Sequence, residues 1–377
     1  MPRKGPGPAA GKAFVSRRRA LALAGATCLA APRAAQAWTV EPLAISTVKP
    51  VELDALWALY QARFAGEDGR IIDRDNGDVT HSEGQGYGML LAAAAGDWPG
   101  FDRIWNWTRT RLGRRDFPLF AWKWSQRSER VEDWNNATDG DILIAWALAR
   151  AGRARDRDDL RLAALQTALA VRARLTMRIA GAPALLPGLK GFVFPGRVSL
   201  NLSYYVFPAF QEFASLDGSD GWNALAEAGR GLARRARFGA ASLPPDWLDM
   251  APDGHVTPAK DRPARFGFDA VRVPLHLAWA GMTAPEDLDV YRQAWTAEGN
   301  LRPPAWRALD GGDDARYPAS SGVMAFADLV AGRRPATATL WSAVGDEGYY
   351  AASLALLALT AADERGLREI AGEQDGG

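Results

Sequence analysis

The chain has 377 residues, of which 48% are hydrophobic and 24% are charged, and its formal net charge is +1. This composition is ordinary for a globular protein that buries a sizeable core, and one large closed barrel can take up such a length. The single cysteine, Cys28, excludes an intrachain disulfide, so stability has to come from packing.

Residues 1–37 are predicted to be an export signal that is removed, which leaves 38–377 as one catalytic domain. Arginines at 17–19 precede the weakly apolar run 20–31, and small residues at 35–37 offer a cleavage site before Trp38. The adjacent arginines favour a twin-arginine signal, with a general secretory signal as the alternative. We therefore expect a periplasmic or secreted protein.

Removal of this leader would leave 38 basic against 44 acidic residues, a net charge of −6. A mildly acidic protein is a poor partner for nucleic acid or for an anionic membrane. No later segment reaches about 18 uninterrupted apolar residues, so stable membrane insertion is not expected. Cys28 lies inside the leader, and Gly25 stands where a lipidation motif needs leucine.

Helical periodicity dominates the remaining chain, and it predicts an all-α fold. The expected helices span residues 53–64, 84–96, 101–112, 139–151, 158–178, 203–214, 221–236, 268–281, 285–296, 318–330, 335–344 and 347–362. Short strands in loops are expected near 120–124 and 191–194. Twelve helices fit six helical hairpins, although their number alone does not distinguish a closed ring from a solenoid.

Residues 81–89 read HSEGQGYGM and place one carboxylate, Glu83, directly before the apolar run 90–95. A glutamate at the mouth of a buried helix is poorly solvated, which favours the neutral form that a general acid requires. Glycines on both sides would let a bulky ligand approach the backbone. Taken alone, the segment fits a capping glutamate in a glycine-rich turn equally well.

Residues 134–145 read WNNATDGDILIA, so that Asp139 and Asp141 open an apolar helix. A helix N-terminus stabilises negative charge, and one aspartate would serve as an ordinary cap. Two acids preceded by two asparagines and a tryptophan exceed what capping needs. The pattern therefore favours a functional role for at least one of them.

Residues 266–274 read FGFDAVRVP, with Asp269 three positions before Arg272. On a helix this spacing brings the two side chains together. For an isolated segment, an ordinary intrahelical ion pair would be the better interpretation.

The chain contains 15 tryptophans, which is an unusually large number. An indole presents a flat apolar face on which the C–H groups of a sugar ring can stack, so the excess fits a sugar-binding cleft. Most of the tryptophans are expected in the core. Trp122, Trp124 and Trp134 are the best cleft candidates, because they lie in irregular sequence just before the acidic motif.

Metal and cofactor chemistry has little support in the sequence. The three histidines, His81, His255 and His276, are far apart and lack closely spaced ligand partners. Residues 73–78 contain three aspartates, but the glycine and the closing glutamate are each one place early for a calcium loop. We expect no metal and no cofactor.

Together the three acidic segments resemble those of glycoside hydrolase family 8. This family contains inverting endoglucanases and related enzymes, among them periplasmic cellulases encoded with bacterial cellulose synthase. Residues 82–89 match its acid motif, 137–141 match its signature, and 268–272 match the segment of its general base. The sequence departs from the pattern at Ala149 and Arg155, and at Phe268, where tyrosine is common. The resemblance extends from about residue 40 to residue 362.

The resemblance implies an (α/α)6 barrel and a role for each matching residue. Glu83 would protonate the glycosidic oxygen, and Asp269 would activate a water on the opposite face of the sugar. Such a pair needs about 6.5–9.5 Å between its carboxyl groups. Asp139 would bind the sugar at the cleavage point, and Arg272 would orient Asp269. The further residues expected to contact substrate are Gln85, Tyr87, Tyr204 and Tyr349.

The expected activity is that of a monomeric endo-1,4-β-glucanase, a cellulase that trims cellulose during synthesis and export. A cellulose synthase complex is a possible partner. Hydrolysis of another β-1,4 polysaccharide, xylan or chitosan, remains open, because the sequence does not place the residues that bind each sugar. A non-catalytic glucan-binding protein is disfavoured, because all three carboxylates are present.

Overall fold

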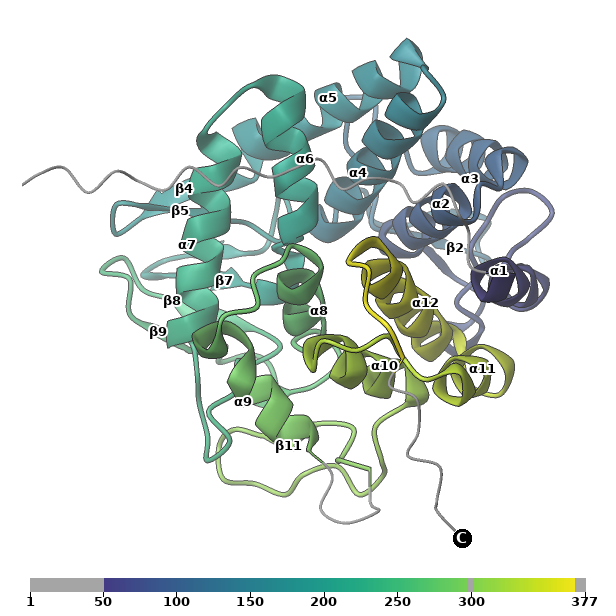
Figure 1. The fold of residues 1–377 in the computed structure, drawn as a ribbon. Helices are drawn as coiled ribbons and strands as arrows, with labels where there is room; N and C mark the ends of the chain where they lie inside the picture. The colour runs from purple at the N-terminus through teal and green to yellow at the C-terminus, as the bar shows by residue number, and fades with distance from the viewer. Residues whose placement is uncertain (1–50, 297–301, 370–377) are drawn as a thin grey trace, which may run out of the picture. The chain divides into compact units, whose positions relative to one another are not determined.

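The computed structural model describes residues 51–296 and 302–369 (Figure 1). These residues belong to one compact unit. The predicted export signal, Cys28 and the last eight residues of the chain lie outside the described ranges. Within them the structure contains twelve α-helices and only short strands, so the expected all-α fold is confirmed.

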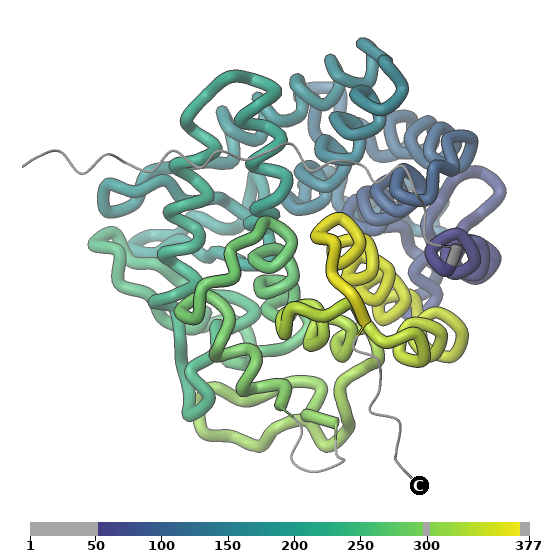
Figure 2. The backbone as a smooth tube through the Cα atoms, in the orientation of Figure 1, coloured from purple at the N-terminus to yellow at the C-terminus, as the bar shows by residue number. Residues whose placement is uncertain are grey.

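Six helices form the inner layer, and each packs against the next: α2 (Ser82–Ala95), α4 (Thr138–Ala154), α6 (Phe207–Asp217), α8 (Arg272–Trp279), α10 (Ser321–Val330) and α12 (Tyr349–Glu364). Helix α12 packs against α2 and closes the circuit. Six helices pack outside them: α1 (Val51–Phe64), α3 (Trp98–Arg111), α5 (Asp158–Arg174), α7 (Gly221–Arg235), α9 (Pro285–Trp295) and α11 (Thr337–Gly345). The alternation is that of an (α/α)6 barrel, and Figure 2 follows it along the backbone.

The inner helices α2 and α12 are buried around nearly their whole circumference, whereas each outer helix keeps an exposed face. Helices α2 and α12 are rich in alanine, glycine and leucine, and nearly every residue in them is buried. A helix that is hydrophobic all round belongs in a core, because no side of it can face water without cost. Within the described ranges, no helix is both long and apolar enough to cross a bilayer.

Short antiparallel strands fill the loops. The largest sheet has the order β6 (Val193–Phe194), β7 (Arg197–Leu200), β8 (Leu248–Met250) and β9 (Val256–Pro258). A second sheet contains β1 (Thr80–His81), β2 (Lys123–Ser125) and β3 (Arg130–Val131). The remaining strands form the pairs β4 (Thr176–Ile179) with β5 (Ala182–Leu185) and β10 (Arg265–Phe266) with β11 (Arg307–Ala308). The two short strands expected from the sequence correspond to β2 and β6.

One helix boundary differs from the expectation in a way that matters for the site. The sequence predicts a helix over 268–281, but α8 begins at Arg272, so Asp269 lies in the turn between β10 and α8. A contact with a distant residue holds this turn. The backbone N–H groups of Gly267, Asp269 and Ala270 donate to the carboxylate of Asp246 at 2.9–3.0 Å.

Candidate active site

Glu83 lies on the first turn of α2, immediately after strand β1. The strand pairs Thr80 with Trp124, and the Ser82 N–H donates to the Trp122 carbonyl at 3.0 Å, which fixes where the helix starts. The glutamate side chain keeps 21% of its surface exposed. The helix therefore presents one partly exposed carboxylate from an otherwise buried segment.

The glycines of the acid motif serve close helix packing, not the approach of a ligand as the sequence suggested. A Cβ at Gly86 would lie 2.5 Å from Cβ of Leu143 on α4, and one at Gly88 would lie 2.5 Å from Cγ1 of Ile71. A Cβ at Gly84 would collide with the Tyr349 hydroxyl. In the signature of α4, a Cβ at Gly140 would lie 2.8 Å from the Glu83 nitrogen.

Arg272 joins the three predicted catalytic carboxylates. Its Nη1 contacts Glu83 and lies 3.3 Å from Oδ2 of Asp139, while its Nη2 donates to Oδ1 of Asp269 at 2.6 Å. The Tyr87 hydroxyl accepts from Nη1 at 3.2 Å and donates to Oε1 of Glu83 at 2.9 Å. Residues from three inner helices and one loop, far apart in sequence, thus meet around one guanidinium.

Exposure separates the three acids into two kinds. Glu83 and Asp269 keep 21% and 28% of their side-chain surface exposed, whereas Asp139 and Arg272 keep only 4% and 5%. Burial raises the pKa of Asp139, and the charge of Asp269 raises it further. Burial, followed by the charge of Asp246, raises the pKa of Asp269. The hydrogen bond from the Gly140 N–H lowers the pKa of Asp139, and those from Asn201 and Trp247 lower the pKa of Asp269.

A site of this kind holds two carboxylates that water and a ligand can reach, with a buried third beside them. The sequence model of the Glycosyl hydrolases family 8 matches residues 23–364, which covers the entire site. The chain belongs to this family. The family comprises inverting glycoside hydrolases. The assignment of the chain to this class of enzymes therefore rests on the match over residues 23–364 as well as on the three motifs.

Known relatives agree in sequence and in fold. A probable endoglucanase of Novacetimonas hansenii is 39% identical over 322 residues, which cover 83% of this chain and 91% of the relative. An endoglucanase of Cellulomonas uda is 38% identical over 73% of this chain and 77% of its own. The structure of an endo-β-1,4-glucanase from Acetobacter xylinum aligns with a TM-score of 0.78 at 38% identity, covering 84% of this chain and 99% of that one.

Four residues expected to contact substrate are buried in this family 8 protein, and Tyr87, at 1% exposed, is one of them. Gln85 is fully buried: its Oε1 accepts from the Ile71 N–H at 2.6 Å, and its Nε2 donates to Oγ1 of Thr108 at 2.8 Å. Trp124 is 8% exposed and lies under Arg70. Tyr349 is 4% exposed and packs against Phe64. The expectation that Gln85 lines the cleft is wrong, because its amide binds protein at both ends. For Tyr87, Trp124 and Tyr349, contact with substrate stays a prediction.

The other expected contacts are more accessible. Trp134 is 50% exposed and lines a pocket of about 410 Å³ with Arg114, Arg115 and Asp116. Trp122 is half-buried beside His81, and its Nε1 donates to Asp133 at 3.0 Å. Tyr204 is also half-buried, and the charges of Asp139 and Asp269 help to raise its pKa, after burial. The roles of all these residues toward substrate stay predictions.

The structure adds residues that the sequence did not single out. Trp247 donates its Nε1–H to Oδ2 of Asp269 at 3.0 Å, and Asp246 holds the turn that carries Asp269. Neither lies in a motif, and only their spatial proximity to the base reveals them. Tyr350, and not its neighbour Tyr349, faces the base side, where its hydroxyl donates to the Phe268 carbonyl.

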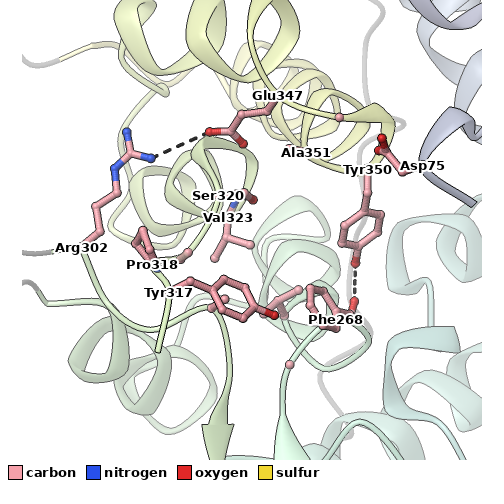
Figure 3. A pocket seen from close by; sticks show the side chains of 15 residues that line it. Asp75, Phe268, Arg302, Tyr317, Pro318, Ser320, Val323, Glu347, Tyr350 and Ala351 are labelled. Atoms are coloured by element: carbon pink, nitrogen blue, oxygen red, sulfur yellow. Dashed lines mark hydrogen bonds and ion pairs between the residues drawn. The ribbon is translucent and has the colours of Figure 1, made fainter. Parts of the chain in front are cut away.

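A pocket of about 390 Å³ opens beside the base, next to the turn that carries Asp269 (Figure 3). Phe268, Tyr317 and Tyr350 line it, together with Arg302 and Glu347. Phe268 and Tyr317 are 43% and 52% exposed, so two aromatic rings are available to a ligand. In the described part of the chain, no group of three or more histidine, cysteine or acidic side chains could hold a metal ion.

Proposed function

We propose that this protein is an inverting endo-1,4-β-glucanase, a cellulase, in which Glu83 is the general acid and Asp269 the general base. One observation carries the assignment: Arg272 holds these two partly exposed carboxylates on its two terminal nitrogens, and the buried Asp139 lies beside Nη1. In an inverting mechanism, one carboxyl group serves the leaving oxygen and the other activates water. Endoglucanases are also what the relatives above are named.

In this scheme Glu83 donates its proton to the glycosidic oxygen as the C–O bond breaks. Three carboxylates around one guanidinium carry excess negative charge, which favours keeping a proton within the group. Asp269 takes a proton from the attacking water, which enters from the other face of the sugar ring. The new C–O bond then has the opposite anomeric configuration.

Asp139 and the aromatic residues act in binding. Asp139 accepts hydrogen bonds from the sugar at the point of cleavage, where Arg272 already anchors its Oδ2. Further sugar units stack on exposed rings, on Phe268 and Tyr317 beside the base and on Trp134 in the other pocket. Binding by stacking suits a neutral polymer such as cellulose.

The cellular role is part of the same proposal. We infer that the protein is exported by a twin-arginine or general secretory signal and trims cellulose as a monomer near the cellulose synthase complex. The leader at 1–37 supports export, and a signal-dependent reporter fused to it tests the route. Loss of export in a strain without the twin-arginine translocase would identify that route, and unchanged export would identify the general one.

The activity is tested by proton NMR of the anomeric signals during hydrolysis of cellopentaose. Fresh α-anomer that appears before mutarotation is the expected result, and the Glu83→Gln variant should produce none. Fresh β-anomer would mean retention and would overturn the assignment of Asp269 as a base. Products from xylan or chitosan but not from cellopentaose would identify that polysaccharide as the substrate. Binding of glucan without any hydrolysis would identify a non-catalytic binding protein.

A further inference from the structure

The turn that carries Asp269 is held from outside by one buried carboxylate. Oδ1 of Asp246 accepts three backbone N–H groups, from Gly267 at 2.9 Å, Asp269 at 3.0 Å and Ala270 at 2.9 Å. Its Oδ2 accepts from Nε of Arg265 at 3.0 Å, and its own N–H donates to the Arg265 carbonyl. Asp246 thus fixes the main chain on both sides of Asp269.

The next residue along the chain holds the carboxylate of Asp269 itself. Trp247 donates Nε1–H to Oδ2 of Asp269 at 3.0 Å, while Arg272 occupies Oδ1. The indole is held by neighbours in turn: Phe192 stacks on it at an interplanar angle of 7°, and the Arg262 guanidinium lies 4.2 Å from its ring centroid. These contacts leave the indole little freedom to release the hydrogen bond.

We propose that Asp246 and Trp247 are the positioning residues of the base: Asp246 sets the main chain that carries Asp269, and Trp247 aims the Asp269 carboxylate. The inference rests on the proposed role of Asp269. It is needed because Asp269 belongs to no helix or strand, so its own secondary structure does not orient it. A displacement of about 1 Å at a reacting group can cost on the order of 10²-fold in rate.

The two residues act on the ionisation of Asp269 in opposite directions. The negative charge of Asp246 raises the pKa of Asp269, whereas the hydrogen bond from Trp247 lowers it; both effects are smaller than that of burial. The other charged or titratable groups that face Asp269 are Arg262, Arg272, Asp139, Tyr204 and Tyr350, with Glu83 across Arg272. None of these changes in the variants below.

The test is the pH dependence of kcat/KM for the full-length enzyme, whose acid limb reports protonation of the base. Asp246→Asn keeps an oxygen acceptor and removes the charge, so the limb should move to lower pH. Trp247→Phe removes the donor, so the limb should move to higher pH. Asp246→Ala also removes the acceptor, so kcat should fall on the order of 10²-fold.

Asp249→Asn is the matched control. Asp249 lies on β8, three residues after Asp246, and is equally buried, but it binds Arg197, Ser199 and the Lys260 N–H, and not the turn with Asp269. Its loss should lower the melting temperature and leave the acid limb in place. The proposal would be overturned if the acid limb of kcat/KM stayed in place in both Asp246→Asn and Trp247→Phe. It would also be overturned if Asp249→Asn moved the acid limb as far as these two variants do.

A second measurement does not depend on activity. The Trp247 indole N–H signal in the ¹H–¹⁵N spectrum of the wild-type protein, assigned by its loss in Trp247→Phe or by sequential NMR, should titrate with Asp269. The titration should disappear in Asp269→Asn. An indole signal that does not titrate would exclude the contact even in an active enzyme. A titrating signal in a protein without glucanase activity would support the contact between Trp247 and Asp269 and would contradict the proposed function instead.

Discussion

Glu83 lies on the first turn of a fourteen-residue helix that is packed on several sides, whereas Asp269 lies in a turn that side chains tie down from outside. On the acid side, glycines bring α2 against Leu143 and Ile71, and the position of the carboxylate follows from helix packing. On the base side, hydrogen bonds with Asp246 and Trp247, and not helix packing, hold Asp269 in position. Arg272 links the two sides.

The difference teaches where each side is vulnerable. In a packed helix, the carboxylate keeps its position when one hydrogen bond is lost but not when a methyl group is added, because interiors are close-packed. A turn held by one carboxylate tolerates changes in volume but not the loss of that acceptor. The following predictions test this contrast, beginning with the largest effect.

Hydrolysis should depend equally on Glu83 and on Asp269. Glu83→Gln removes the proton donor and Asp269→Asn removes the proton acceptor, and each should lower kcat on unactivated β-glucan by about 10²–10⁴-fold. Both changes are isosteric, so the melting temperature should stay close to that of the wild type. Steady-state kinetics and calorimetry check this, and a variant that keeps substantial activity would lose its assigned role.

Gly86→Ala should disturb the packing of α2 against α4, and with it the position of Glu83. Its Cβ would lie 2.5 Å from Leu143 Cβ and 3.2 Å from the Ile144 nitrogen, so α2 and α4 would have to separate. We expect a loss of about 1–3 kcal/mol in the free energy of unfolding, together with a lower kcat as Glu83 shifts. Denaturant unfolding and kinetics measure the two effects, and unchanged stability would contradict the packing argument.

Gln85→Leu should lower stability while changing catalysis little. The variant leaves the Ile71 N–H and the Thr108 hydroxyl without their buried partner, which should cost about 1–3 kcal/mol. KM for cellopentaose should stay within a factor of about two, because the amide is away from solvent. A large rise in KM with unchanged stability would restore Gln85 as a substrate contact.

Gly231→Ala should give the smallest effect, with the opposite sign. Gly231 lies in α7, and a Cβ there meets no atom within 4 Å. Alanine costs less conformational entropy in a helix, so stability should rise by about 0.5–1 kcal/mol with unchanged kcat. The pair Gly86→Ala and Gly231→Ala thus compares the same substitution in a packed and in an open helix, by thermal unfolding under identical conditions.

Much of the helical fold and the three catalytic candidates could be predicted from local sequence. Helical periodicity located all twelve helices, because it reflects which face each helix buries. Its errors lie where distant residues intervene: the helix expected to include Asp269 starts at Arg272, and the distant Asp246 binds the N–H groups of the turn before it. Gln85 was misjudged for a related reason, since its partners at Ile71 and Thr108 belong to other elements.

The sequence by itself determined the family and the order of the helices and proposed the three candidate acids, because these depend on residue types at short spacing. Only the tertiary structure decided that Arg272 joins all three carboxylates, that Tyr350 faces the base side in place of Tyr349, and that Asp246 and Trp247 hold Asp269. Apart from the Arg272–Asp269 pair, these contacts join residues that lie 21 to about 190 positions apart. No local pattern encodes such contacts, because they arise only when the barrel closes and brings its loops together.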